Sequence, residues 1–516
     1  QNYFQNSAAD DPEMSYMISA WARICKILGD QFATYLPLVM PPVMRAASFK
    51  PDVAVMDDED VGEEKEDPDW NFVPLGDQKL FGIKTAGLED KATACEMLVC
   101  YAREMKGAFA PYVEGVAELM IPLLKFVFHG TVRSAAADCL PCLLECARPR
   151  GQELRARLWS AFLPAFQEAI DVENDLEVLA DHLHGLGLCV EELGTELVTE
   201  EHLSIISGII NTQMTKYWER RKEREKKKTD EDEDDEDAQE ALNDEIEEEV
   251  GVLTRVSDMI HCLFMVFHER FMQYFDQLEV QFAPLLDARN YYAEKQWVIC
   301  MYDDLIEFGG SGSIKYQPKF YGPMIAALSD DSPEVRQAAA YGFGIMGQRG
   351  GPAYAEACAG ALQHLAATVN RPQARATAED TAATENAISA VAKILKHNAS
   401  LIDTNAVIPT FLSWLPIWED TDETPYVYGY FADLVESNSP LVLGENNSNL
   451  PRILTIIVEA FEKGAFEDAE DAENTKNRLI QIVKFLHSDE AMFRAVITSA
   501  NLSEASMATL QQLLAC

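Results

Sequence analysis

Acidic and aromatic side chains that occur together on single helical stretches are the residues of this sequence best suited to chemistry. Carboxylates pair with lysine and arginine, and an indole ring can hold an aliphatic stem or a cation. We therefore predict a surface that binds a basic peptide. Its candidate residues are Trp297, Asp303, Asp304, Glu307, Glu385, Asn386, Asp433 and Glu436. The alternative is that these are ordinary solvated helix faces and that the tryptophan is a core residue.

Catalytic and metal-binding patterns are absent from the sequence. It contains no HExxH, P-loop or GxSxG motif, and its 9 histidines are dispersed. The glycine-rich segment 309–313 follows a predicted helix, whereas a phosphate-binding loop needs a strand before it. Cys139 and Cys142 lack a second pair at ligand spacing, so we interpret them as core residues. We expect neither an enzyme nor a metal or cofactor site.

The charge of the chain indicates which partners it attracts. It has 86 acidic and 42 basic residues, which gives a formal net charge of −44. Such a chain repels nucleic acid and anionic membranes and attracts basic proteins. No apolar run approaches the roughly 20 residues of a membrane span, so we expect a soluble protein without a membrane segment.

Two acidic segments, 51–80 and 229–250, are predicted to be insertions. The second follows the basic stretch 216–228 directly, so it either shields the lysines of that stretch or captures basic partner proteins. The alternative for both segments is a solvated, disordered loop that is acidic only for solubility. The run that we single out in the second insertion is Asp230, Glu231, Asp232, Glu233, Asp234, Asp235, Glu236 and Asp237.

The elements that must position these residues recur at a fixed spacing. DDSPEVRQAAAYGFGIMGQRGG (330–351) has the start and stop signals of one helix and a face of small residues. Segments that align with it are 41 to 43 residues apart, as in Ala137-Asp138-Cys139-Leu140 and Ala180-Asp181-His182-Leu183. This is the period of HEAT and armadillo repeats, in which each helix pair packs only against its neighbours.

The pattern predicts an all-α HEAT-repeat α-solenoid, which is a right-handed superhelix of antiparallel helix pairs. We expect about ten repeats in a single domain over residues 1–516, closed by a short helix pair at 490–499 and 503–515. An irregular all-helical enzyme domain would not hold this spacing. The second helices, which line the concave side of such a superhelix, are expected near 14–28, 89–106, 132–147, 175–193, 254–270, 293–309, 333–348, 383–397, 424–437 and 474–487.

The segment 331–348 resembles the HEAT motif, with Asp331 in the turn and Arg336 early in the second helix. That resemblance implies a ladder of such residues between repeats. Arg133 keeps the basic position, although Gly130 stands where the aspartate is expected. Longer stretches resemble the importin-beta superfamily, or karyopherins, and together they cover nearly the whole chain. These stretches are 14–29, 81–102, 332–348, 383–396 and 437–454.

The superfamily resemblance implies the C-terminal half of a nuclear import receptor that shuttles between cytoplasm and nucleus. Such receptors bind basic cargo, including ribosomal proteins and histones, pass FG nucleoporins and release cargo to Ran-GTP. Ran-GTP is expected to bind mainly through the N-terminal half, which this sequence lacks. Two alternatives remain: a static HEAT scaffold that holds an enzyme, and a chaperone for basic proteins without transport activity.

Overall fold

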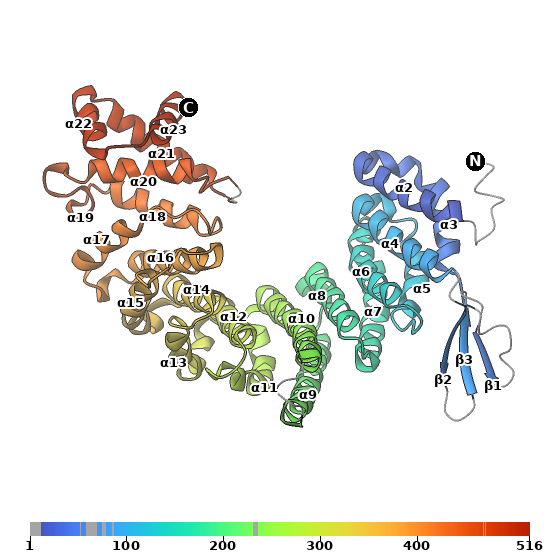
Figure 1. The fold of residues 1–516 in the computed structure, drawn as a ribbon. Helices are drawn as coiled ribbons and strands as arrows, with labels where there is room; N and C mark the ends of the chain where they lie inside the picture. The colour runs from blue at the N-terminus through green and yellow to red at the C-terminus, as the bar shows by residue number, and fades with distance from the viewer. Residues whose placement is uncertain are drawn as a thin grey trace. The chain divides into compact units, whose positions relative to one another are not determined.

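The chain forms two compact units of antiparallel helix pairs, an N-terminal unit (Gln1–Phe267) and a C-terminal unit (His268–Cys516) (Figure 1). The computed structural model describes residues 12–51, 53–57, 70–74, 79–84, 87–230, 236–467, 469 and 471–516. The helical pairs confirm the predicted HEAT-repeat fold. Short 3₁₀ segments connect many helices: Gly29–Thr34, Lys106–Phe109, Arg148–Arg150, His268–Phe271, Ala283–Leu286, Gly310–Tyr316, Gly351–Tyr354, Ala399–Leu401 and Glu445–Asn447.

The N-terminal unit stacks its second helices on one another as one layer. This inner layer is α2 (Pro12–Leu28), α4 (Leu88–Met105), α6 (Gly130–Cys146), α8 (Leu176–Leu197) and α10 (Glu236–Phe267). The first helices of the pairs are α3 (Leu36–Ala47), α5 (Val113–Leu123), α7 (Gln152–Val172) and α9 (Glu200–Asp230). Small residues allow the stacking, since a Cβ on Gly185 of α8 would lie 2.6 Å from the carbonyl oxygen of Ala137 in α6.

The C-terminal unit repeats the same arrangement. Its inner layer is α12 (Tyr292–Phe308), α14 (Pro333–Arg349), α16 (Ala378–Asn398), α18 (Thr424–Glu436) and α21 (Glu473–His487). The other helices are α11 (Met272–Phe282), α13 (Gln317–Ala327), α15 (Ala355–Val369), α17 (Thr404–Trp414), α19 (Pro440–Leu443) and α20 (Leu450–Glu462). The expected closing pair is present as α22 (Glu490–Ala500) and α23 (Glu504–Ala515).

Helix α14 shows why its face must be small. The Ser332 hydroxyl caps it by accepting the Val335 N–H at 3.3 Å. A Cβ on Gly344 would lie 3.3 Å from the Cα of Ala390, and one on Gly347 would lie 3.1 Å from the backbone nitrogen of Ile394. Because these positions of α14 are glycines, its backbone can contact the backbone of α16 directly.

The first acidic insertion contains a small sheet that the sequence analysis did not anticipate. Strands β1 (Val53–Asp57), β2 (Trp70–Pro74) and β3 (Lys79–Lys84) form an antiparallel sheet in the order β1-β3-β2. Val53 lies opposite Ile83, and Trp70 lies opposite Lys84. The disordered-loop alternative is therefore wrong for these strands. The three strands pair with one another. Helices α3 and α4, which precede and follow the insertion, pack against each other.

The second acidic insertion is largely helical, which corrects the prediction of a loop over 229–250. Helix α9 ends at Asp230 and α10 begins at Glu236, so Glu236 and Asp237 are helical. Glu231, Asp232, Glu233, Asp234 and Asp235 lie outside the described residues. Acidic residues at a helix N-terminus are stabilised by the helix dipole, which explains how so acidic a segment starts a helix.

Helix α10 also contains an apolar stretch that the sequence analysis overlooked. The range Leu242–Leu286 contains a window of 18 residues that is apolar enough to span a membrane by length and composition alone. In the structure the apolar side chains of α10, among them Val256, Ile260 and Leu263, are buried, and α10 packs on α8. The stretch is therefore explained as a core helix.

Candidate functional site

The predicted HEAT ladder is present, but its acidic partner differs from the predicted one. Arg336 donates to the carbonyls of Asp330 and Asp331, both at 2.8 Å, and pairs with Asp380 at 2.5 Å. The Asp331 carboxylate is fully exposed and pairs instead with Arg371 at 3.4 Å. Asp331 thus contributes its backbone carbonyl to the ladder, and the carboxylate comes from the start of the next inner helix.

Arg133 of α6 follows the same rule in the N-terminal unit. It pairs with Glu173 at 2.8 Å and with Asp175 at 3.4 Å. Asp175 is the N-cap of α8, so it too opens the next inner helix. The ladder therefore joins a cation in one repeat to an acid about 42 to 44 positions later.

The predicted residues on α12 lie together but mostly beneath the surface. Trp297 is buried and packs edge-on against Phe282 with ring centroids 5.5 Å apart, so the core alternative holds for it. Asp303 and Asp304 are 3% and 8% exposed. Glu307 is half-buried and accepts a hydrogen bond from the Tyr341 hydroxyl at 3.3 Å.

The predicted residues on α16 hold a loop, which corrects their assignment to cargo binding. Glu385 is fully buried and accepts the backbone N–H groups of Trp418, Glu419 and Asp420 at 2.7–3.0 Å. Asn386 is also buried and donates to the Asp420 carboxylate. Both side chains are therefore occupied inside the repeat, because the segment after α17 folds back over them.

The predicted residues Asp433 and Glu436 of α18 remain at the surface, but the chain supplies their cations. Asp433 pairs with Lys396 and Arg478, each at 2.8 Å, and Glu436 pairs with Arg478 at 2.7 Å. These ion pairs reduce the charge that a partner would meet there. Surface pairs of this kind contribute little stability, so they compete only weakly with an incoming cation.

A groove along the inner helices of the N-terminal unit was missed by the sequence analysis. It consists of two adjoining cavities, of about 510 and 610 Å³, which share Arg103 and Asp138. The first is lined from α2, α4 and α6, and the second from α6, α8 and α10 together with Arg103 of α4 and Arg148. Its acidic lining residues are Glu96, Glu104, Asp138, Glu145, Asp181, Glu191 and Glu192.

Two of these acids lie close enough to influence each other, and Arg103 and Arg255 line the same cavity. Asp138 and Asp181 occupy equivalent positions in neighbouring repeats, and neither forms an ion pair with a residue that the structure describes. Burial and then the charge of Asp181 raise the pKa of Asp138 above its ordinary value, and Arg103, His184 and Arg255 partly oppose this. The 43-residue spacing of the two Ala-Asp pairs was the sequence signal that could have located this site.

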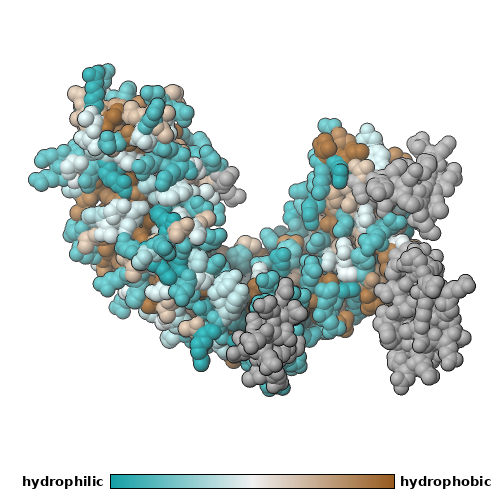
Figure 2. All heavy atoms as spheres, viewed as in Figure 1, coloured by the Kyte–Doolittle hydropathy of each residue, from teal (hydrophilic) through white to brown (hydrophobic). Residues whose placement is uncertain are grey.

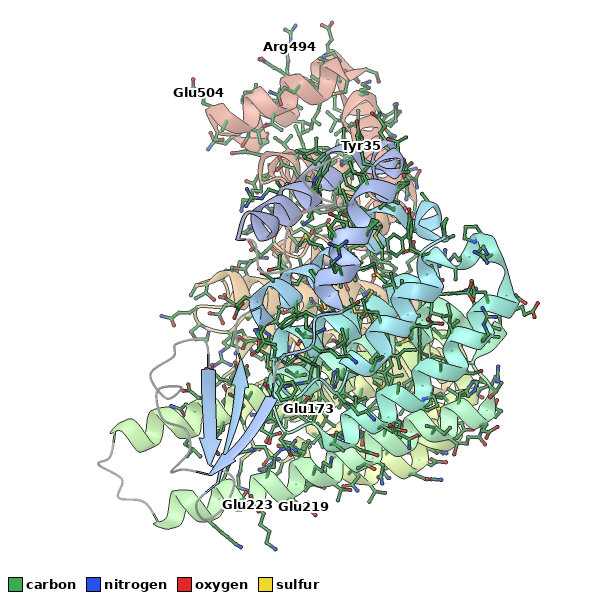
Figure 3. The ribbon with its side chains drawn as sticks, turned by 90° about the vertical axis from the view of Figure 1, so that its right-hand side faces the viewer. Tyr35, Glu173, Glu219, Glu223, Arg494 and Glu504 are labelled. Carbon is green, nitrogen blue, oxygen red and sulfur yellow. The ribbon has the colours of Figure 1, made fainter. Side chains whose placement is uncertain are left out.

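Two arginines at the basic end of α9 pair with an acid of α10. Glu249 of α10 is 2% exposed and pairs with Arg220 and, at 3.0 Å, with Arg224. Glu219 and Glu223 project from the same end of α9 (Figure 3). Glu249 therefore pairs with two arginines of the basic stretch, whereas shielding of its lysines by the acidic run stays a prediction.

Comparisons with known proteins show similarity to importins along most of this chain. Residues 178–288 match the model for importin repeat 6, and residues 320–349 match the HEAT repeat model. The importin subunit beta-3 of Saccharomyces cerevisiae is 27% identical over 95% of this chain and 44% of its own length. A probable importin-5 homolog of Dictyostelium discoideum is 26% identical over 88% of this chain and 42% of its own length.

Solved structures of the karyopherin Kap121p share the fold. Kap121p bound to RanGTP matches with a TM-score of 0.78 at 24% identity, covering 99% of this chain and 45% of Kap121p. Kap121p bound to Nup53p matches with a TM-score of 0.76 at 24% identity, covering 96% and 44%. The chain spans less than half the length of the curated relatives it matches. Along almost all of its own length, this chain is therefore similar to importin subunit beta-3 of yeast, and it shares the HEAT-repeat fold of Kap121p.

Proposed function

We propose that this chain is part of a nuclear transport receptor and that the groove of its N-terminal unit binds basic segments of cargo. The observation that carries the proposal is the pair Asp138 and Asp181, which lines the groove and forms no ion pair with a described residue, although Arg103, Arg148 and Arg255 line the same cavity. Two like charges that are partly withdrawn from water favour an incoming lysine or arginine. The net charge of −44 adds a long-range attraction to the same partners.

The family resemblance supplies the rest of the proposal. Ribosomal proteins and histones are lysine- and arginine-rich, so they suit the groove as cargo. FG nucleoporins and Ran-GTP are proposed as partners of the whole receptor, which would shuttle between cytoplasm and nucleus. Structures of Kap121p with RanGTP, Nup53p and Ste12p support such partners for that relative. No chemistry beyond binding is required of the chain.

The groove can be tested with a labelled lysine-rich histone-tail peptide in a salt-titrated anisotropy assay. The double variant Asp138→Asn, Asp181→Asn should bind the peptide about tenfold more weakly at low salt. The difference should shrink as salt rises, since screening weakens partly exposed charge pairs. Thermal unfolding should not fall, because the substitution removes a repulsion between two like charges.

The matched control is the double variant Glu118→Gln, Glu153→Gln, which removes two exposed carboxylates from α5 and α7 of the same unit. It should bind the peptide as the unmodified chain does. Equal weakening in both double variants would show that only net charge matters and would contradict a groove site. No peptide binding at low salt would contradict the function itself for this part of the receptor.

A further inference from the structure

A cluster of carboxylates lies at the seam between α12 and α14 of the C-terminal unit. Asp303 is 3% exposed, and neither carboxylate oxygen has a hydrogen-bond partner among the described residues. Burial and then the charges of Asp304 and Glu307 hold the pKa of Asp303 well above its ordinary value. A buried carboxyl without a partner costs stability, so its presence requires an explanation.

The neighbouring helix is shaped around this carboxyl. A Cβ on Gly342 of α14 would overlap Oδ1 of Asp303, so only glycine leaves space for that oxygen. Glu307 is 19% exposed, lies 3.9 Å from the guanidinium of Arg349 and accepts a hydrogen bond from the Tyr341 hydroxyl. The seam therefore has a carboxyl floor and a mouth formed by a carboxylate and an aromatic ring.

The next repeat contains a filled version of such a site. The Lys393 ammonium lies 2.7 Å from Glu423, 5.3 Å from the centre of the Tyr341 ring and 5.6 Å from that of Tyr426. Its stem passes Gly344, whose Cβ would lie 3.1 Å from Cδ of the lysine. This unit thus uses carboxylate and tyrosine to bury a lysine.

The repeat alignment places Asp303, Gly344 and Lys393 at the same position of successive inner helices, eight residues after Lys295, Arg336 and Glu385. At this position α16 has the cation Lys393, α14 has Gly344, which carries no side chain, and α12 has the acid Asp303. The lysine pocket between α14 and α16 is therefore filled by the chain, whereas the described chain provides no cation for Asp303.

We infer that the α12–α14 seam is a binding site for a lysine side chain of a partner, with Glu307 and Tyr341 at its mouth and Asp303 at its floor. The inference rests on the proposed function, because it gives basic cargo a second binding site, which holds one lysine side chain. An ammonium group suits the site better than a guanidinium, because the filled example holds lysine and the floor presents a single carboxyl. Entry of the lysine requires the side chains above Asp303 to move aside.

Fluorescein-labelled pentalysine and its fully Nε-acetylated form are the probes for a test on the whole chain. Asp303→Asn keeps the shape of the side chain and removes its charge. We expect it to weaken pentalysine binding about fivefold, to leave binding of the acetylated peptide unchanged, and to leave thermal unfolding unchanged or slightly raised. The control Glu356→Gln on α15 should bind pentalysine like the unmodified chain.

Carbodiimide crosslinking of bound pentalysine gives a second reading that does not depend on a substitution. An amide bond should form on the peptide that contains Asp303, Asp304 and Glu307, and mass spectrometry locates it. Equal affinity of Asp303→Asn and the unmodified chain, or crosslinks that avoid this peptide, would overturn the inference. In that case loss of pentalysine binding in the Asp138→Asn, Asp181→Asn variant would still support the proposed function, so the two failures are distinguishable.

Discussion

Arg336 of α14 and Asp380 at the start of α16 form a 2.5 Å ion pair across 44 positions of the chain. The arginine side chain is 3% exposed and the aspartate 23% exposed, so the pair lies largely beneath the surface. Arg336 also satisfies two carbonyls of its own turn. One side chain thus fixes both the turn before its helix and the distance to the next repeat.

Replacing Arg336 should loosen the contact between these two repeats. Arg336→Leu leaves Asp380 and two carbonyls without their donor, and the local opening free energy should fall by about 3 kcal/mol. Hydrogen exchange of the amides in α14 and α16 measures this loss. Arg494→Leu on α22, whose arginine is 82% exposed, should change exchange by less than about 0.5 kcal/mol. Equal effects of the two variants would contradict the role of the ladder.

Asp420 should make the C-terminal unit more stable in mild acid. Burial, with Glu423 and Asp422 nearby, raises its pKa from 3.8 to about 7. Between these two values the folded state retains a proton that the unfolded state has released, so stability falls as pH rises from about 4 to 7. Asp420→Asn should remove this slope and stabilise the unit above pH 7 by up to a few kcal/mol.

The measurement for Asp420 is the variant-minus-parent difference in thermal unfolding across that pH range. The amide oxygen of the variant can still accept from Asn386 and Gln337, so packing should persist. Asp331→Asn, at a fully exposed position, is the control and should keep the slope of the parent. A difference for Asp420→Asn that does not vary with pH would contradict the raised pKa.

Glu249 should hold together the projecting ends of α9 and α10. Glu249→Gln removes the charge that binds Arg220 and Arg224. Opening of the helix ends should then increase, and trypsin should cleave after residues 220–226 about tenfold faster. The neighbouring Glu248 is exposed, so Glu248→Gln should leave cleavage unchanged. Similar rates for all three proteins would show that other contacts hold the pair.

Gly342 should tolerate no side chain. Gly342→Ala places a Cβ on Oδ1 of Asp303 and on Cε of Met324, and overpacking of this kind costs about 2 kcal/mol. Gly208→Ala in α9 meets no atom within 4 Å, so it should stabilise its helix by up to about 1 kcal/mol. Urea unfolding of both variants should show opposite signs. A neutral Gly342→Ala would mean that α14 can shift away from α12.

The sequence predicted the repeat period, the inner helices and the closing pair, because each depends on local patterns. Ser332 caps its helix, and the small residues of α14 recur at helical spacing. Both features can be found without knowing what packs against the helix. Arg133 and Arg336 occupy the same place within their repeats, and each pairs with an acid at the start of the next inner helix. The three strands within 53–84 were not anticipated, because charge dominates that segment and pairing between strands is not a local property.

Only the tertiary structure determines which side chains are available to a partner. Glu385 looked like a surface acid of α16, yet N–H groups more than 30 residues later in the chain enclose it. Asp331 appeared to be the ladder acid, although Asp380 of the next repeat fills that role. A carboxylate is satisfied by whichever donor the fold brings within 3 Å, and in a solenoid that donor comes from the adjacent repeat. The repeat pattern therefore fixes where an acid stands, whereas packing between repeats determines whether it is paired, buried or available to a partner.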